Sequence, residues 1–163
     1  EDRQRIGLFT DFKAYENLIF GYHHQEPFSK SSILKEKEIL SFSKKVMEEY
    51  DVRPRSPNLI TSNFSGGNQQ KIILSRELNE NPKVLLVGQP TRGVDIGAIE
   101  FIHQRLIDMR DKGAAILLVS VELEEVLSLS DRIVVMFDGN IVGEKINKDV
   151  TDRELGLLMA GVA

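Results

Sequence analysis

A serine followed by two glycines at the start of a predicted helix is the clearest candidate for chemistry in this sequence. The triplet is Ser65-Gly66-Gly67, and the residues after it, up to Asn81-Pro82, have the apolar spacing of a helix with one buried side. Glycines let backbone N–H groups approach an anion, a helix N-terminus carries partial positive charge, and a serine hydroxyl adds a donor. The triplet therefore predicts a phosphate-binding surface, and a plain glycine turn that caps the helix is the open alternative.

Further motifs follow this turn along the chain. The turn itself lies in the octapeptide Phe64-Ser65-Gly66-Gly67-Asn68-Gln69-Gln70-Lys71. After it come an apolar strand at Val84 to Val87, the run Gln89-Pro90-Thr91-Arg92-Gly93-Val94-Asp95, a strand ending at Ser120, then Asp131-Arg132-Ile133 and Gly139. The octapeptide resembles the signature loop of the ATP-binding cassette (ABC) family, and the order of the other motifs is similar to that of the same family. The resemblance implies a partial P-loop NTPase (RecA-like) fold with a helical subdomain.

Hydrophobic periodicity independently indicates an α/β fold. Helical spacing dominates before residues 79–82, and continuous apolar strands alternate with amphipathic helices after them, as in a parallel sheet covered by helices on both faces. Helices are expected over 14–20, from near Ser31 to Tyr50, after Gly67, over 96–110, over 122–127 and after Thr151, and strands over 84–87, 115–119, 133–137 and 141–144. We expect residues 1–80 to form the helical signature subdomain, with a first strand near 6–9, and residues 81–163 to form the C-terminal part of the RecA-like core.

The resemblance assigns roles to particular residues. In the ABC family the signature loop of one cassette closes over the γ-phosphate of ATP held by the opposite cassette, and this role carries over to Ser65, Gly66 and Gly67, with Asn68 in the same loop. Phe64 and Asn68 replace the commonest Leu and Gln, although Asn is familiar in the sugar-importer branch. Asp95 corresponds to the loop that bridges the two cassettes; capping of the following helix is the alternative interpretation.

The first residues of the chain resemble the same branch. Glu1-Asp2-Arg3, followed by Gly7-Leu8 and Glu16-Asn17-Leu18, is similar to a region of monosaccharide and nucleoside importers that faces the permease. The resemblance therefore implies permease coupling for Glu1, Asp2 and Arg3. A solvated terminus is the alternative.

Three positions depart from the family's catalytic pattern. Gly88 and Gln89 stand where the family has an aspartate for Mg²⁺ and a glutamate that polarises the attacking water, and Val121 stands where it has a histidine. Glycine lacks a carboxylate, a neutral amide is no base, and valine forms no hydrogen bond. The run that begins Gln89-Pro90-Thr91 resembles nucleoside importers related to basic membrane lipoprotein systems.

The phosphate loop, Gly-x-x-x-x-Gly-Lys-Ser/Thr, is not found in these residues, and in the family it lies upstream. We expect a fragment that neither holds ATP tightly nor hydrolyses it alone, with ATP and Mg²⁺ belonging to the full assembly. No dedicated metal site is expected at His23, His24 or His103, since paired surface histidines without nearby carboxylates are common.

Composition narrows the class of protein further. The net charge of −4, with both signs interspersed, argues against nucleic-acid binding. The absence of cysteine agrees with a cytosolic location, and the apolar runs fall short of the about 20 residues of a membrane-spanning helix. Any membrane role must therefore use a partner.

The leading hypothesis is a degenerate C-terminal cassette of an importer ATPase for a simple sugar or nucleoside. Its expected partners are the N-terminal cassette of the same protein or a second ATPase subunit, transmembrane permease subunits and, indirectly, an extracytoplasmic substrate-binding protein. Its expected place is the cytoplasmic face of the cell membrane, as a peripheral protein. The alternatives are a catalytically dead structural or regulatory module and a soluble cassette ATPase without a transport role.

Overall fold

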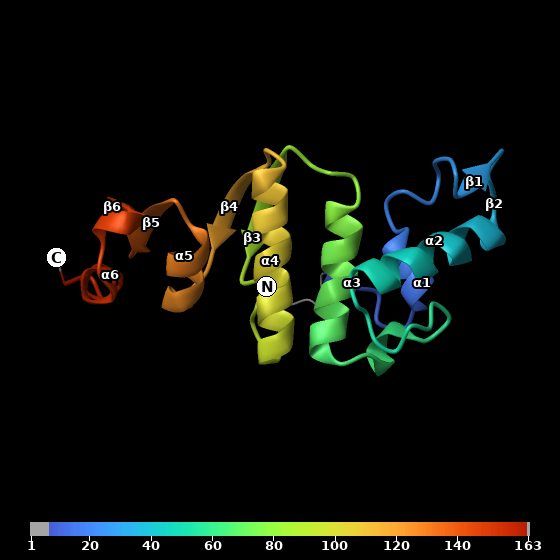
Figure 1. Ribbon diagram of the computed structural model, residues 1–163, viewed down its shortest axis with the longest axis horizontal. Coiled ribbons are helices and arrows are strands. Elements are labelled where there is room, and N and C mark those ends of the chain that lie inside the picture. The colour runs from blue at the N-terminus through green and yellow to red at the C-terminus, as the bar shows by residue number, and fades with distance from the viewer. Residues whose placement is uncertain (1–6, 163) are drawn as a thin grey trace. The chain divides into compact units, whose positions relative to one another are not determined.

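Helices α3 (Gly66–Leu78) and α4 (Ile96–Asp111) contact each other in the first of two units of the chain (Figure 1). The structure, a computed structural model, describes residues 7–162. The first unit contains the described residues up to Val84 together with Pro90–Ala115. Its other elements are α1 (Ala14–Leu18), β1 (Ser29–Lys30), β2 (Ile33–Leu34), α2 (Glu36–Glu49) and a short 3₁₀ turn, Thr61–Asn63.

The second unit contains Leu85–Gln89 and the described residues from Ile116 onward. Its elements are β3 (Val84–Gly88), β4 (Ala115–Val119), α5 (Leu123–Leu129), β5 (Arg132–Phe137), β6 (Asn140–Ile146), a 3₁₀ turn (Asn147–Asp149) and α6 (Asp152–Met159). Val84, the first residue of β3, and Ala115, the first residue of β4, belong to the first unit. The elements lie close to the expected ranges, and the α/β fold class is confirmed by the structural neighbours described below.

The first unit buries the apolar stripes that the periodicity predicts. Ile72 and Leu78 of α3 and Ile102, Leu106 and Met109 of α4 are all buried. A second cluster joins Ile19, Phe28 and Ile39, with Tyr15, Tyr22 and Phe42 packed against it. Burial of apolar side chains at helical spacing therefore fixes which faces of α2, α3 and α4 turn inward.

The side chain of Asn17 joins three segments of the first unit. Its amide oxygen accepts the N–H of Phe9 at 2.9 Å, and its amide nitrogen donates to the carbonyl of Phe9 and to Oγ1 of Thr61, both at 2.9 Å. Asn17 and Thr61 are fully buried. Because buried polar groups are costly unless they are paired, this amide holds the loop at Phe9 and the turn at Thr61 against α1.

A β-hairpin precedes α2 and was not predicted. The expected helical segment near Ser31 is wrong at its start, because Ser31 and Ser32 adopt φ angles of 51° and 65° and turn the chain between β1 and β2. Both central residues of such a turn need positive φ, for which Asn-Gly is the usual signal. Two serines give no such signal, so the helix begins only at Glu36.

Antiparallel pairing organises the second unit. Strands β5 and β6 pair through a turn at Asp138 and Gly139, whose φ angles are 45° and 74°. Ile133 and Val135 pack with Leu155 of α6, the best-buried apolar residues of this unit. The predicted capping box of α6 is formed: Oγ1 of Thr151 accepts the N–H of Glu154, and the Glu154 carboxylate accepts the N–H of Thr151, which holds the pKa of Glu154 below its ordinary value.

Strands β3 and β4 form a separate two-stranded sheet, and they run parallel. Ala115 N–H donates to the Lys83 carbonyl and Gln89 N–H to the Val119 carbonyl, which is the hydrogen-bond sense of parallel strands. Leu86 and Leu117 are 77% and 60% exposed. Among the described residues, burial alternates along β3 as it does in a sheet with one solvent-facing side.

Residues 7–9 do not form the strand expected near 6–9, and residues 1–6 lie outside the described residues. The boundary at residue 80 between a helical subdomain and a RecA-like core stays a prediction. Among the described helices, none has both the length and the apolarity that crossing a bilayer requires.

Asn17→Ala is expected to destabilise the first unit by about 2–4 kcal/mol, because it leaves buried groups of Phe9 and Thr61 without partners. The midpoint of urea denaturation of the complete protein, followed by circular dichroism, measures the loss. Asn58→Ala, which changes an exposed asparagine, is the matched control and should stay within about 0.5 kcal/mol. Equal midpoints for the two variants would contradict the role of Asn17.

Candidate functional site

Helix α3 begins beside an exposed serine, Ser65, and its first backbone N–H groups follow that residue. Ser65 is the N-cap residue, with extended backbone angles (φ −61°, ψ 158°), and its carbonyl accepts the first helical hydrogen bond from Gln69 N–H at 2.9 Å. The N–H groups of Gly66, Gly67 and Asn68 therefore have no acceptor inside the helix. Within the described residues, the Ser65 side chain does not cap them. This is the arrangement that the sequence predicts for binding a phosphate.

Asn68 bridges the signature serine and the preceding loop. Its Nδ2 donates to Oγ of Ser65 at 2.8 Å, and its Oδ1 accepts the N–H of Arg53 at 2.7 Å. Both side-chain ends of the amide thus contact the protein itself. The Ser65 hydroxyl is held in place by a side chain of the same helix turn.

Gly67 allows the N-termini of α3 and α4 to meet. A Cβ atom at Gly67 would lie 2.8 Å from Oδ2 of Asp95, closer than real Cβ contacts, and 3.0 Å from Cβ of Ala98, which is tighter than most of them. Oδ1 of the same aspartate accepts the N–H of Ala98 at 2.9 Å and caps α4. The capping interpretation of Asp95 is therefore confirmed, and its place in a cassette interface stays a prediction. The structure brings Asp95 together with the glycine turn, which the sequence alone did not reveal.

A buried glutamine of α3 donates hydrogen bonds to the chain just before the glycine turn. Gln69 is 2% exposed, and its Nε2 donates to the carbonyls of Thr61 and Phe64, each at 3.2 Å. Phe64, which replaces the commonest Leu of the family, is itself buried. The 3₁₀ turn before the signature loop is thus tied to the helix that follows it.

A second set of contacts joins the end of α2 to α3 and α4. Nζ of Lys71 donates to the Asp51 carbonyl at 3.0 Å, lies 3.5 Å from the Asp51 carboxylate, and stands 4.7 Å from the ring centre of Phe101. Nε of Arg53 donates to the Asp51 carboxylate at 2.8 Å, and this bond, followed by the charge of Lys71, lowers the pKa of Asp51. The carboxylate therefore stays ionised at neutral pH and holds the loop that also reaches Asn68.

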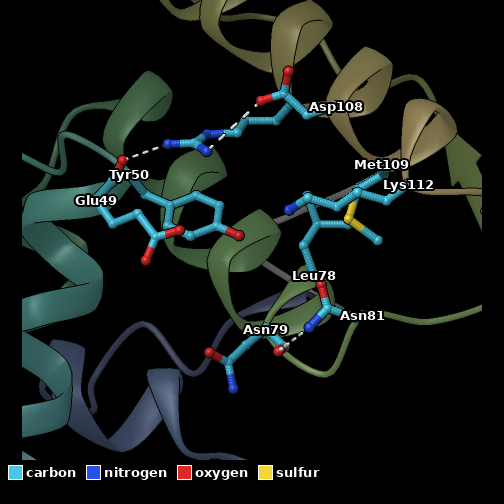
Figure 2. Close-up of a pocket in the computed structure, with 9 residues that line it drawn as sticks. Glu49, Tyr50, Leu78, Asn79, Asn81, Asp108, Met109 and Lys112 are labelled. Carbon is cyan, nitrogen blue, oxygen red and sulfur yellow. Dashed lines mark hydrogen bonds and ion pairs between the residues drawn. The ribbon is translucent and has the colours of Figure 1, made fainter.

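A polar pocket of about 250 Å³ lies between the end of α2 and the C-terminal ends of α3 and α4 (Figure 2). Arg105 crosses it from α4, donating to the carbonyl of Glu49, with its guanidinium 4.8 Å from the ring centre of Tyr50. Burial, followed by the charge of Glu49, raises the pKa of Tyr50, so its phenol stays protonated. Because the pocket includes Leu78, the last residue of α3, a helix length separates it from Gly66 at the other end. The contacts of Arg105 link α4 to the end of α2. The pocket is therefore separate from the signature loop.

The three positions that depart from the family pattern lie at one edge of the β3–β4 pair in the second unit. Gly88 ends β3, Gln89 follows it with φ 52°, and Val121 lies two residues beyond the end of β4. The hydrogen bond from Gln89 N–H to the Val119 carbonyl, 2.8 Å, ties the two strand ends together. In open α/β sheets this carboxyl edge is where ligands bind. Here it carries no carboxylate at the predicted catalytic positions.

Within residues 7–162 there is no group of three His, Asp or Glu side chains placed to hold a metal ion. The rings of His23 and His24 are 5.6 Å apart, edge to face, at the surface. Glu1, Asp2 and Arg3, predicted to couple to a permease, lie outside the described residues.

The chain is similar in sequence to known import ATP-binding proteins. No protein-family model matches the chain. It is 45% identical over 161 residues to the guanosine import ATP-binding protein NupO of Bacillus subtilis and 47% identical over 161 residues to the nucleoside import ATP-binding protein NupA of Lactococcus lactis, covering 99% of this chain and 32% of each relative. The ribose import ATP-binding protein RbsA of Oceanobacillus iheyensis is 34% identical over 155 residues, covering 95% of this chain and 31% of that protein. The chain thus spans about a third of the length of these relatives.

Solved structures show the same architecture. The ADP conformation of MJ1267, an ATP-binding cassette of an ABC transporter, matches with a TM-score of 0.66 at 25% identity, over 93% of this chain and 60% of that one. A nucleotide-free ATP-binding cassette from an ABC transporter matches with a TM-score of 0.68 at 26% identity, over the same shares. The fold is therefore that of an ABC-type P-loop ATPase cassette. The chain belongs to the ATP-binding cassette family, in the branch of sugar and nucleoside import ATP-binding proteins.

Sequence reasoning missed several residues that build the site. The N–H of Arg53, the side chain of Lys71 and the buried amide of Gln69 all position the turn, and none of them was assigned a role from the sequence. The polar run Asn68-Gln69-Gln70 inside a helix with a buried side was the available signal, because a buried polar side chain needs partners. It gave no indication of which partners they are.

Gly67→Ala is expected to destabilise the first unit by about 1–3 kcal/mol, because its Cβ has to push Asp95 and Ala98 aside. Gly97→Ala is the control: its Cβ comes no closer than 3.5 Å to Asp95, and alanine in a helix is neutral or stabilising by up to about 1 kcal/mol. Urea denaturation of the complete protein compares the two. A Gly67→Ala variant as stable as the parent would show that the close approach is not required.

Proposed function

We propose that this chain is part of the second, degenerate cassette of an importer ATPase, and that its signature loop completes the ATP site of the partner cassette. The observation that carries the proposal is the open start of α3: the first N–H groups are uncapped, and Ser65 stands exposed beside them. A γ-phosphate presented by another cassette meets N–H donors, a hydroxyl and the positive end of a helix. Ser65, Gly66, Gly67 and Asn68 make up this surface.

The cassette's own catalytic edge is proposed to be inactive. A Cβ at Gly88 would meet no atom within 4 Å, so an aspartate is not excluded by crowding from the described residues. This edge lacks that carboxylate, a base at Gln89 and a hydrogen-bonding group at Val121. We attribute these losses to the loss of ATP hydrolysis at this edge and not to packing constraints. An asymmetric pair of cassettes, one site active and one inactive, accounts for a kept signature loop beside a lost catalytic edge.

A nucleoside is the proposed cargo. The relatives named for guanosine and nucleoside import share 45% and 47% identity with the chain, against 36% for a glucose import protein of Haloferax volcanii and 34% for the ribose import protein. The run Gln89 to Gly93 supports the same subgroup. Uptake of radiolabelled guanosine, compared with ribose, by cells that carry the complete system tests this assignment.

The proposed assembly follows from the family. The partners are the first cassette, in the same polypeptide or in a second subunit, and transmembrane permease subunits, with an extracytoplasmic substrate-binding protein acting through the permease. ATP and Mg²⁺ belong to the complete assembly, which lies on the cytoplasmic face of the membrane. Asp95, exposed at the start of α4, is proposed to lie at the cassette interface.

Ser65→Ala in the complete ATPase is expected to lower kcat about 10- to 100-fold, because one hydrogen bond to a charged phosphate is lost. Ser62→Ala, an exposed serine of the preceding turn, is the matched control and should stay within about twofold of the parent. Steady-state phosphate release at saturating ATP is the measurement. Unchanged turnover in Ser65→Ala would remove the trans role of the loop.

Gln89→Ala is expected to leave the kcat of the complete ATPase within about twofold, because a neutral amide has no part as a base. The corresponding substitution of the catalytic glutamate in the partner cassette should abolish turnover. A large loss in Gln89→Ala would mean that this edge is catalytic after all. A complete protein without any ATPase activity would instead favour the dead regulatory module.

A further inference from the structure

The orientation of the Asn68 amide is fixed by a backbone donor. The N–H of Arg53 requires an acceptor, so the oxygen of the amide must face Arg53, where the distance is 2.7 Å. The nitrogen of the amide therefore faces Ser65, at 2.8 Å from Oγ. This end of Asn68 has hydrogens and no lone pair to offer.

The direction of this bond decides what the serine hydroxyl does. Oγ of Ser65 accepts a hydrogen from Asn68, and its own proton has to point elsewhere. An N-cap serine ordinarily accepts from the N–H groups of the first helical turn. Here the oxygen of Ser65 accepts from Asn68 and makes no cap hydrogen bond to the first turn of α3.

We propose that Asn68 is a positioning residue, which holds Ser65 as a donor toward the partner's γ-phosphate. The inference rests on the proposed function and assigns Asn68 a part that acts through Ser65, not through direct contact with nucleotide. Its two side-chain ends already contact Ser65 and Arg53. The second hydrogen of its Nδ2 is the competing route to a nucleotide, and a suitable experiment separates the two.

The same bond connects the serine to the loop after α2. Arg53 also donates to Asp51, whose carbonyl and carboxylate hold Lys71 of α3. The position of the Arg53 N–H is thereby fixed relative to the helix that carries Ser65. Asn68 is the part of this network that reaches the nucleotide-facing side of the helix.

A double-mutant cycle in the complete ATPase tests the inference. Asn68→Ala alone is expected to lower kcat about 3- to 10-fold, because the hydroxyl is no longer held. In the Ser65→Ala background the same substitution is expected to change kcat by less than about twofold, since there is no hydroxyl left to position. If the losses instead multiply, Asn68 contacts the nucleotide independently and the inference is wrong.

The cycle separates this inference from the function on which it rests. If Ser65→Ala leaves turnover unchanged, the trans role of the loop fails. If Ser65→Ala lowers turnover and the losses multiply, only the positioning role fails. Asn58→Ala, an exposed asparagine of the same loop region, should not change kcat in either background, and equal denaturation midpoints of all variants exclude a general loss of structure.

Asn68→Asp gives a second, sharper readout. A carboxylate at this position still accepts the Arg53 N–H, but it also accepts the Ser65 proton and diverts it from phosphate. Asn68→Asp is therefore expected to lower kcat more than Asn68→Ala when Ser65 is present, and to lose this excess in the Ser65→Ala background. An excess that persists without Ser65 would come from charge repulsion alone and would contradict the inference.

Discussion

The close approach of two helix N-termini is the constraint on which the site depends. Helix α4 begins at a capping aspartate, Asp95, and α3 meets it at Gly67, where a Cβ atom would overlap the carboxylate and Ala98. A capping carboxylate is stable there because it accepts an N–H of its own helix and lies at the positive end of the helix dipole. The second glycine of the signature loop is therefore needed by the fold of this chain. Any role in binding phosphate is added to a position that packing already restricts.

Polar contacts then set the finer geometry of the turn. The buried amide of Gln69 ties the helix to the 3₁₀ turn before it, and the amide of Asn68 ties the serine to the loop at Arg53. The two residues are adjacent, but one faces the interior and the other faces the loop. Because the side chain of Ser65 does not cap α3, neighbouring side chains hold the start of this helix in place.

Much of the fold could be predicted because it depends on periodicity. The stripe Ile102, Leu106 and Met109 and the capping box at Thr151 were both predicted correctly. The β1–β2 hairpin was missed, since two serines at positive φ break the usual turn rules. At the site, residue types predicted the helix start at the glycine turn, and its binding of an anion stays a prediction. The contact of Asp95 with Gly67 joins residues far apart in sequence that only the folded chain brings together.

The length of the side chain at position 68 explains why asparagine suits this turn. The residue lies three positions after the N-cap, and from there its amide reaches both Oγ of Ser65 and the N–H of Arg53 at 2.8 Å and 2.7 Å. Glutamine, the commoner residue of the family, adds a methylene and moves the amide outward by about 1.5 Å. In a capping box that longer reach serves the backbone N–H of the N-cap residue. The shorter Asn68 donates to the side chain of the N-cap residue, Ser65, instead of accepting its backbone N–H. It thereby couples the hydroxyl of Ser65 to the loop after α2, and in the proposed function the backbone donors of the turn are left for an external anion.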